Sequence, residues 1–99
     1  MVRHIIIWDF KDDLSLEQRA EFSQKIKNGL EGLVGVIEGL RTVMVYTDIL
    51  STSTGDIMLD SVFDDEAALA YYAEHPAHVA VKEIVHVAVK SRKCVDILI

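Results

Sequence analysis

The chain has 99 residues, of which 51% are hydrophobic and 26% charged, and its formal net charge at pH 7 is −6. This length suits one domain with a single core, residues 1–99, and the composition is that of a folded protein. The negative charge argues against a nucleic-acid-binding surface, because such surfaces collect Lys and Arg. No apolar run approaches the roughly 20 residues that span a bilayer, and the lone cysteine fits a reducing compartment, so we expect a cytoplasmic protein without membrane contact.

The first half of the chain predicts a strand, a helix and a second strand. His4–Phe10 suits a strand with both faces covered, and Leu40–Thr47, rich in β-branched residues, predicts the second strand. In the first strand, alternation puts His4, Ile6, Trp8 and Phe10 on one side and Ile5, Ile7 and Asp9 on the other. Ser15, followed three residues later by Gln18, forms a capping box, so a helix should begin there. Its buried stripe is expected at helical spacing, at Ala20, Phe22, Ile26, Leu30 and Leu33, before Gly32 and Gly35 end it.

The second half predicts a strand, two helices and a final strand. Residues 51–55 form a polar loop, and Asp56–Phe63 follows as the third strand. The acidic residues at 64–66 suit the N-terminus of a short helix, Ala67–Ala73. Pro76 cannot continue that helix but suits the first turn of a new one, so Pro76–Lys90 is predicted as a separate helix. Arg92–Ile99 closes the chain as the fourth strand.

This order of elements is β-α-β-β-α-β with the second helix split in two. It predicts a ferredoxin-like α+β fold, in which an antiparallel sheet carries its helices on one face. The strands supply apolar groups to both faces of that sheet, from Ile5, Ile7, Val43, Val45, Met58, Val62, Val95, Ile97 and Ile99. A helix-free face this apolar needs a cover. We therefore expect a symmetric homodimer in which two sheets pack face to face into a barrel.

The segment YYAEHPAHVAVKE, residues 71–83, is the densest group of polar rings in the chain. Positions 75, 78, 82 and 86 fall near one stripe of the second-half helix, and Tyr72 lies on the apolar side of its own helix. The first and last strands of this fold are neighbours, which brings Asp96 alongside His4. His78 could then act as a base, with Tyr72 as a hydrogen-bond donor and the other two groups supporting them.

A structural interpretation of the same residues stays open. A histidine beside a proline is common at a helix start, and Tyr72 could be a core residue with a wet hydroxyl. His75 and His78 could bind a metal, but no third ligand follows at suitable spacing, so we predict no metal site. Cys94 is expected to be a small core residue, because it lies in an apolar stretch. Trp8 is expected in the core, on the face where it could also touch a ligand.

The sequence resembles the stress-responsive α/β-barrel domain family, which includes plant stress proteins and a polyketide cyclase, olivetolic acid cyclase. The resemblance covers the whole chain and is carried by His4–Ile7, Leu59–Phe63, Tyr72–Val79 and Arg92–Asp96. The tyrosine and His-Pro-x-His segment is the specific signature among these.

The resemblance implies a dimeric barrel and an acid–base pair at Tyr72 and His78, supported by His4 and Asp96. On this basis the candidate catalytic residues are the first two, and the candidate substrate-binding residues are His4, Asp96, Ile6, Trp8 and Phe22. The chain departs from the cyclase at Ile57, where the cyclase has a further pocket histidine. It also departs at Ser23 and Ile26, where the cyclase has aromatic residues.

Two classes of function follow, and a third has no dedicated signature. The first is a protein that binds a small, mostly apolar carbonyl compound and catalyses cyclase- or lyase-like acid–base chemistry without a cofactor. The second is a non-catalytic stress-associated dimer whose histidines only satisfy buried polar groups, and the third is a cofactor-free monooxygenase. An open pocket beside His78 would favour the first class, and a filled core would favour the second.

Overall fold

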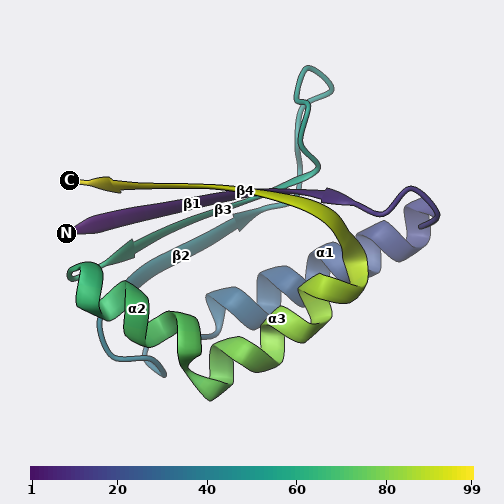
Figure 1. Cartoon of the computed structure of the whole chain (residues 1–99). Coiled ribbons are helices and arrows are strands. Elements are labelled where there is room, and N and C mark those ends of the chain that lie inside the picture. The colour runs from purple at the N-terminus through teal and green to yellow at the C-terminus, as the bar shows by residue number, and fades with distance from the viewer.

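The computed structural model describes residues 1–99 and contains one sheet and three helices. The elements are β1 (Val2–Phe10), α1 (Leu16–Glu31), β2 (Leu40–Tyr46), β3 (Ile57–Phe63), α2 (Glu66–Glu74), α3 (Pro76–Ala88) and β4 (Val89–Leu98). The sheet has the order β2-β3-β1-β4, and every neighbouring pair is antiparallel. All three helices lie on one face of the sheet (Figure 1). The predicted ferredoxin-like α+β fold is confirmed.

Side-chain alternation along β1 places its residues as the sequence predicted. Val2, Ile6 and Trp8 are buried against the helices, whereas Ile5 and Ile7 lie on the helix-free face. The core consists of 18 buried residues from the helix-facing side of the sheet and the inner faces of the helices. It extends under β1 and β3 but not under the outer part of β4.

Helix α1 begins at the predicted capping box. The Ser15 hydroxyl accepts the backbone N–H of Gln18 at 3.1 Å, and the Gln18 side chain accepts the N–H of Ser15 at 2.8 Å. Ile26 and Leu30 are buried as expected. Ala20 is exposed, which corrects the predicted stripe. Ala20 lies six positions before Ile26. At about 100° per residue, six steps leave its side chain roughly 120° away from the buried face of the helix.

The break between α2 and α3 falls at the predicted proline. Asp65 caps α2 by accepting the N–H of Ala68 at 2.8 Å. His75 ends α2 and is also the N-cap of α3, where its Nδ1 accepts the N–H of Ala77 at 3.1 Å. Pro76 occupies the first turn, where a missing N–H costs nothing. His75 therefore has a local structural role at this corner.

Helix α3 ends two residues earlier than the sequence predicted, and β4 begins three residues earlier. Val89 pairs with Phe10 across an irregularity in the β1–β4 ladder, so β4 follows α3 without a loop. Pairing with β1 gives the backbone N–H and C=O groups after Ala88 hydrogen-bond partners, so strand pairing competes with a further helical turn. The local sequence does not distinguish these two outcomes, because the partner strand lies about 80 positions away in sequence.

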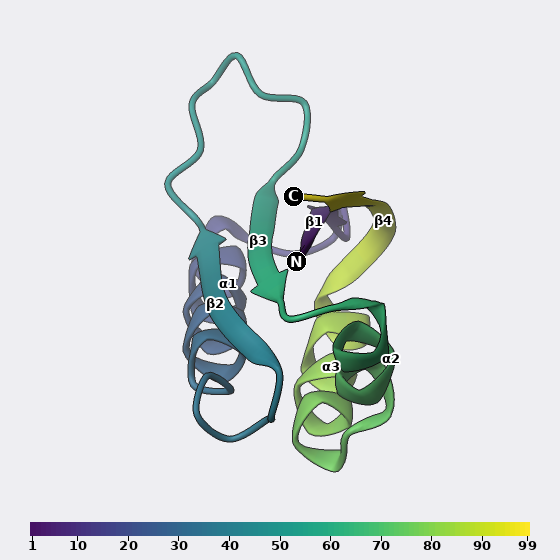
Figure 2. The ribbon, with the colours of Figure 1, turned by 90° about the vertical axis from the view of Figure 1, so that its left-hand side faces the viewer.

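Strand β4 is an edge strand, and its residues from position 90 onwards are exposed. Figure 2 shows the sheet end-on, with α1 behind β2 and with the C-terminal end of β4 apart from α2 and α3. The prediction that Cys94 is a core residue is therefore wrong, because its thiol is exposed. Its cross-strand partner Ile6 is buried, so Cys94 faces the helix side of the sheet at a place where no helix covers the strand.

The helix-free face of the sheet is predominantly apolar and open to solvent. Five large hydrophobic residues on it are exposed: Ile7, Met44, Tyr46, Val95 and Ile97. Arg3 on β1 and Asp60 on β3 form an ion pair on the same face, with Nη2 and Oδ2 2.6 Å apart. The loop between β2 and β3 projects from this side of the sheet (Figure 1). None of the helices is long and apolar enough to cross a membrane.

Two glycines in the segment before β2 have backbone conformations that favour glycine. Gly35 and Gly39 have φ values of 85° and 88°, a region that costs an L-residue about 1–2 kcal/mol. A Cβ on Gly39 would lie 2.6 Å from the Ala68 Cβ, whereas one on Gly35 would meet nothing within 4 Å. We expect Gly39→Ala to lower the free energy of unfolding by about 1–3 kcal/mol more than Gly35→Ala. Chemical denaturation of both variants measures the difference, and equal losses would contradict this packing.

Candidate functional site

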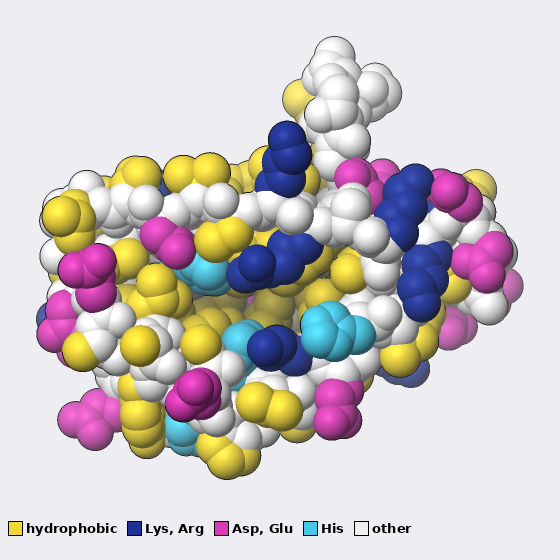
Figure 3. Space-filling view, in the orientation of Figure 1, with side chains coloured by type: hydrophobic (Ala, Val, Ile, Leu, Met, Phe, Trp, Pro, Cys, Tyr) yellow, Lys and Arg dark blue, Asp and Glu magenta, His cyan; other side chains and the backbone are white.

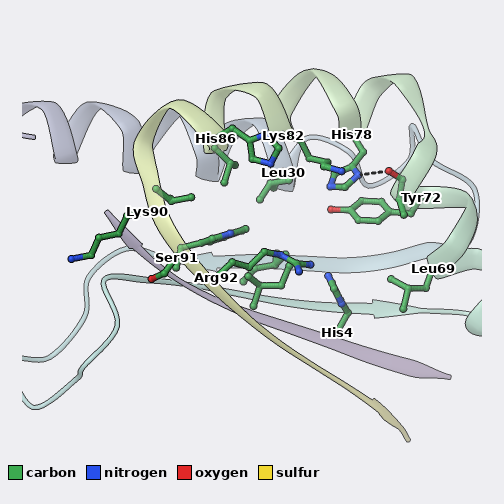
Figure 4. A pocket seen from close by; sticks show the side chains of 16 residues that line it. His4, Leu30, Leu69, Tyr72, His78, Lys82, His86, Lys90, Ser91 and Arg92 are labelled. Carbon is green, nitrogen blue, oxygen red and sulfur yellow. Dashed lines mark hydrogen bonds between the residues drawn. The ribbon is translucent and has the colours of Figure 1, made fainter. Parts of the chain in front are cut away.

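A pocket of about 500 Å³ lies between the sheet and the two helices of the second half. Its apolar wall comes from Ile6, Trp8, Leu30, Leu59, Leu69 and Val85. Polar side chains from α2, α3, β1 and β4 surround its opening (Figure 4). The pocket lies beside the part of β4 that no helix covers.

Tyr72, on α2, forms part of the pocket wall and is 2% exposed. Its ring stacks on the His78 ring with centroids 3.9 Å apart and meets the Phe63 ring edge-on at 4.9 Å. The hydroxyl points into the pocket (Figure 4). That oxygen is buried and has no hydrogen-bond partner in the chain. A buried hydroxyl without a partner costs about 1–3 kcal/mol, so folding does not explain its presence.

Burial raises the pKa of the Tyr72 hydroxyl far above its ordinary value, and the positive charge of Arg92 opposes that rise only in part. The hydroxyl therefore stays protonated near neutral pH. A protonated phenol in a partly dry pocket is a hydrogen-bond donor for an oxygen that gains negative charge.

His78, in the first turn of α3, lies beside Tyr72 at the pocket wall. Its Nδ1 lies 3.3 Å from the carbonyl oxygen of Ala73, and because a carbonyl can only accept, Nδ1 carries the proton. Nε2 is then the basic nitrogen. Burial lowers the pKa of His78, the Ala73 carbonyl opposes this, and the charge of Lys82 lowers it further. The ring is therefore neutral near pH 7 and able to accept a proton.

His4 lies on the strand side of the same pocket and is buried. It faces Asp96 across the β1–β4 ladder, and its Nδ1 forms a hydrogen bond with the Asp96 carboxylate. The predicted pairing of these two residues is thus present. Cys94 Sγ lies 3.6 Å from both groups, so this cluster has the ligand types that could hold a metal ion. Its three ligand atoms contact one another directly in the structure.

The pocket brings together most of the residues that the sequence singled out. Tyr72, His78 and His4 line it, together with the apolar Ile6 and Trp8. Asp96 lies behind His4 and lines a smaller neighbouring cavity of about 340 Å³. Phe22 packs against the core from α1 and is not among the pocket-lining residues.

Two cationic residues at the opening were not assigned a role from the sequence. Lys82 and Arg92 both line the pocket, from α3 and β4. Lys82 stands one helical turn after His78 and one before His86, so helical spacing alone could have identified it. Arg92 has the same parity along β4 as Asp96, which places both on the helix side of the sheet.

Comparison with known families matches residues 2–99 to the Stress responsive A/B Barrel Domain. The chain belongs to this family. The match confirms the resemblance that the His-Pro-x-His segment carried. No curated protein sequence matches the chain.

Solved structures with this fold include other stress-responsive A/B barrel proteins and an enzyme. A dimeric protein of unknown function with a ferredoxin-like fold, from Bacteroides fragilis, is 32% identical over 99% of this chain and 95% of its own, with a TM-score of 0.93. A protein from Arabidopsis thaliana is 25% identical over 100% of this chain and 95% of its own, with a TM-score of 0.79. A hydroxynitrile lyase from Passiflora edulis is 17% identical over 99% of this chain and 92% of its own, with a TM-score of 0.75.

Proposed function

We propose that this stress-responsive A/B barrel protein binds a small carbonyl compound with an apolar body and catalyses acid–base chemistry on it without a cofactor. His78 acts as the base, and Tyr72 donates a hydrogen bond to the carbonyl oxygen. His4 and Asp96 support the opposite wall of the pocket. The working form is a homodimer.

The Tyr72 hydroxyl carries this proposal. It is buried, lacks a partner in the chain and points into an open pocket of about 500 Å³. A structural tyrosine would be expected to satisfy its hydroxyl within the core, as buried polar groups usually do. A ligand carbonyl in the pocket would supply the missing acceptor. The open pocket beside His78 supports a ligand-binding role over a filled, purely structural core.

The chemistry that these groups support is removal of a proton from the carbon next to the carbonyl. Nε2 of His78 takes the proton, and the C–H electron pair moves into a new carbon–carbon double bond. The carbonyl oxygen gains the negative charge, which the Tyr72 hydroxyl stabilises. The resulting enolate can take the proton back or attack a second carbonyl, as a cyclase-like reaction requires. One protein with this fold is a hydroxynitrile lyase, so the fold supports catalysis in that protein.

The homodimer is supported by the open apolar face of the sheet. Met44 on β2 and Val95 and Ile97 on β4 are each about half exposed there, on the two edge strands of the sheet. A second copy of the same face would bury these residues around a two-fold axis. The protein from Bacteroides fragilis, at 32% identity, is described as dimeric.

Proton exchange in deuterated water tests the chemistry without knowledge of the natural substrate. We expect the protein to speed the exchange of α-protons in some members of a panel of aryl and alkyl ketones, followed by NMR. The rate should rise with pH as His78 loses its proton and level off near neutral pH, because the pKa of His78 lies below its ordinary value of 6.5. The charged and titratable neighbours of the ring are Lys82, His4 and Tyr72, on whose ring it stacks. His78→Gln should lower the rate by about 100-fold or more.

The matched control is Glu83→Gln, an exposed residue of the same helix that does not line the pocket. It should leave exchange within about twofold of the wild-type rate. Exchange that is absent throughout the panel, while the ketones bind beside Tyr72, would leave a binding protein and refute the catalytic part. Failure of every ketone to bind would refute the proposal as a whole.

A further inference from the structure

The pocket has a charge that is opposite to the charge of the whole protein. The chain contains 16 Asp and Glu residues, yet none of them is among the 16 residues that line the pocket. The lining includes instead the positive charges of two lysines and one arginine, together with three histidines as further hydrogen-bonding groups. Figure 3 shows Lys, Arg and His side chains gathered around the hollow between the sheet and the helices. Such a collar attracts anions, and low-dielectric walls strengthen its field.

Two of the three cations have no acidic partner. Neither Lys82 nor Arg92 takes part in any of the six ion pairs of the structure. Both side chains extend over the pocket, one from the helical wall and the other from β4 (Figure 4). Lys90, the third, turns away from the pocket and binds Asp12 with its Nζ 2.6 Å from the carboxylate. The unpaired positive charge is therefore concentrated beside the Tyr72 and His78 pair.

We propose that Lys82 and Arg92 form an anion-binding subsite at the pocket opening, so that the ligand is a carbonyl compound with an anionic headgroup, such as an oxo acid. The apolar body would lie along Ile6 and Trp8, with its carbonyl at Tyr72 and its anionic end at the two cations. This inference rests on the proposed function, because it uses the same pocket. It replaces a wholly apolar ligand by an amphipathic one.

The two cations also act on the catalytic pair. Burial is the main cause of the lowered pKa of His78, and the charge of Lys82 adds to it. The charge of Arg92 likewise acts on Tyr72. An anion bound between Lys82 and Arg92 would cancel part of this field, which makes His78 a stronger base only when the ligand is in place.

Paired probes with the same body and different headgroups test the subsite. The probes are ω-benzoylalkanoates with two to five methylene groups, each compared with its neutral primary amide by calorimetry at low salt. We expect the best carboxylate to bind at least about tenfold more tightly than its amide, because hydrogen bonds to charged groups are the stronger ones. The preference should shrink in 0.5 M salt. Replacing the carboxylate by a phosphate of the same length identifies which anion the subsite prefers.

The variant Lys82→Gln/Arg92→Gln should reduce carboxylate affinity to that of the amide and leave amide affinity unchanged. Lys90→Gln removes a positive charge that already pairs with Asp12 and points away from the pocket, so it is the matched control, with no expected change in preference. Equal affinity of carboxylate and amide for the wild-type protein would overturn the anion subsite, and so would an equal effect of Lys90→Gln. Amide binding that Tyr72→Phe weakens would then show that the proposed function survives, whereas no binding of either series overturns both.

Discussion

Tyr72→Phe is expected to lower catalysed proton exchange by about 100- to 1,000-fold while making the protein more stable by about 1 kcal/mol. The loss of activity corresponds to removal of one hydrogen-bond donor to a developing oxyanion. The gain in stability follows because the buried hydroxyl has no partner in the chain, so its removal relieves an unmet desolvation cost. The ring contacts with Phe63 and His78 involve only the aromatic ring and are retained.

Tyr71→Phe is the matched control for this experiment. Tyr71 is the preceding residue on α2, is 55% exposed and places its hydroxyl outside the pocket. Its loss should change neither activity nor stability beyond about 0.5 kcal/mol. Thermal unfolding reads the stability difference, since 1 kcal/mol corresponds to a shift of about 4–8 °C in Tm for a domain of this size. A lower Tm for Tyr72→Phe would mean that the hydroxyl stabilises the fold, and the functional interpretation would lose its main support.

The elements were predictable wherever a local chemical signal marks a boundary. Ser15 with Gln18, the acidic run before α2 and Pro76 each satisfy or remove backbone groups at a helix end, and these interactions lie within a few residues in sequence. Strand parity was equally local. It placed His4, Ile6 and Trp8 on one face, which is the face that lines the pocket.

Cys94 shows where such reasoning fails. Its neighbours Val95 and Ile97 are apolar, but they serve the helix-free face, and Cys94 itself faces a part of the sheet that no helix covers. Whether a strand lies at an edge depends on the packing of all the elements, and the pattern of one segment does not contain that information. The same open edge exposes Arg92, so the apolar pattern of this segment does not indicate that Arg92 lies at the pocket opening.

The candidate site was partly predictable because its residues belong to regular elements with known periods. Helical spacing put His78, Lys82 and His86 on one stripe, and the adjacency of the first and last strands paired His4 with Asp96. The size of the pocket was not predictable, because it depends on how closely α2 and α3 pack against β1 and β4, and the pattern of a single segment does not contain that information.

Val95→Glu is expected to convert the proposed homodimer into a monomer at micromolar concentration. Val95 lies on β4, is 59% exposed and belongs to the apolar face that we propose to be covered by a second copy. In a two-fold symmetric interface one substitution introduces two carboxylates, and each burial without a partner costs several kcal/mol. We expect the dimer dissociation constant to rise by at least about a thousandfold, which corresponds to about 4 kcal/mol.

Val87→Glu is the matched control, because Val87 has the same exposed fraction, 59%, but lies on α3 away from the sheet. It introduces the same charge into a chain that already carries −6 and should leave the dimer intact. Light scattering distinguishes the two states, since the chain mass is 11.1 kDa and the dimer has twice that mass. The Tm of the wild-type protein should also rise with concentration, as it does for proteins stabilised by association.

A wild-type protein whose mass stays at 11.1 kDa at high micromolar concentration would refute the dimer. The apolar face of the sheet would then be exposed to water in the working protein. If the Val95→Glu variant is still a dimer, the interface lies on another surface of the protein. Arg3 offers a further distinction, because it pairs with Asp60 on the same apolar face. If two sheets cover that pair, removing one partner leaves a buried charge, so Arg3→Leu should weaken the dimer far more than the isolated chain.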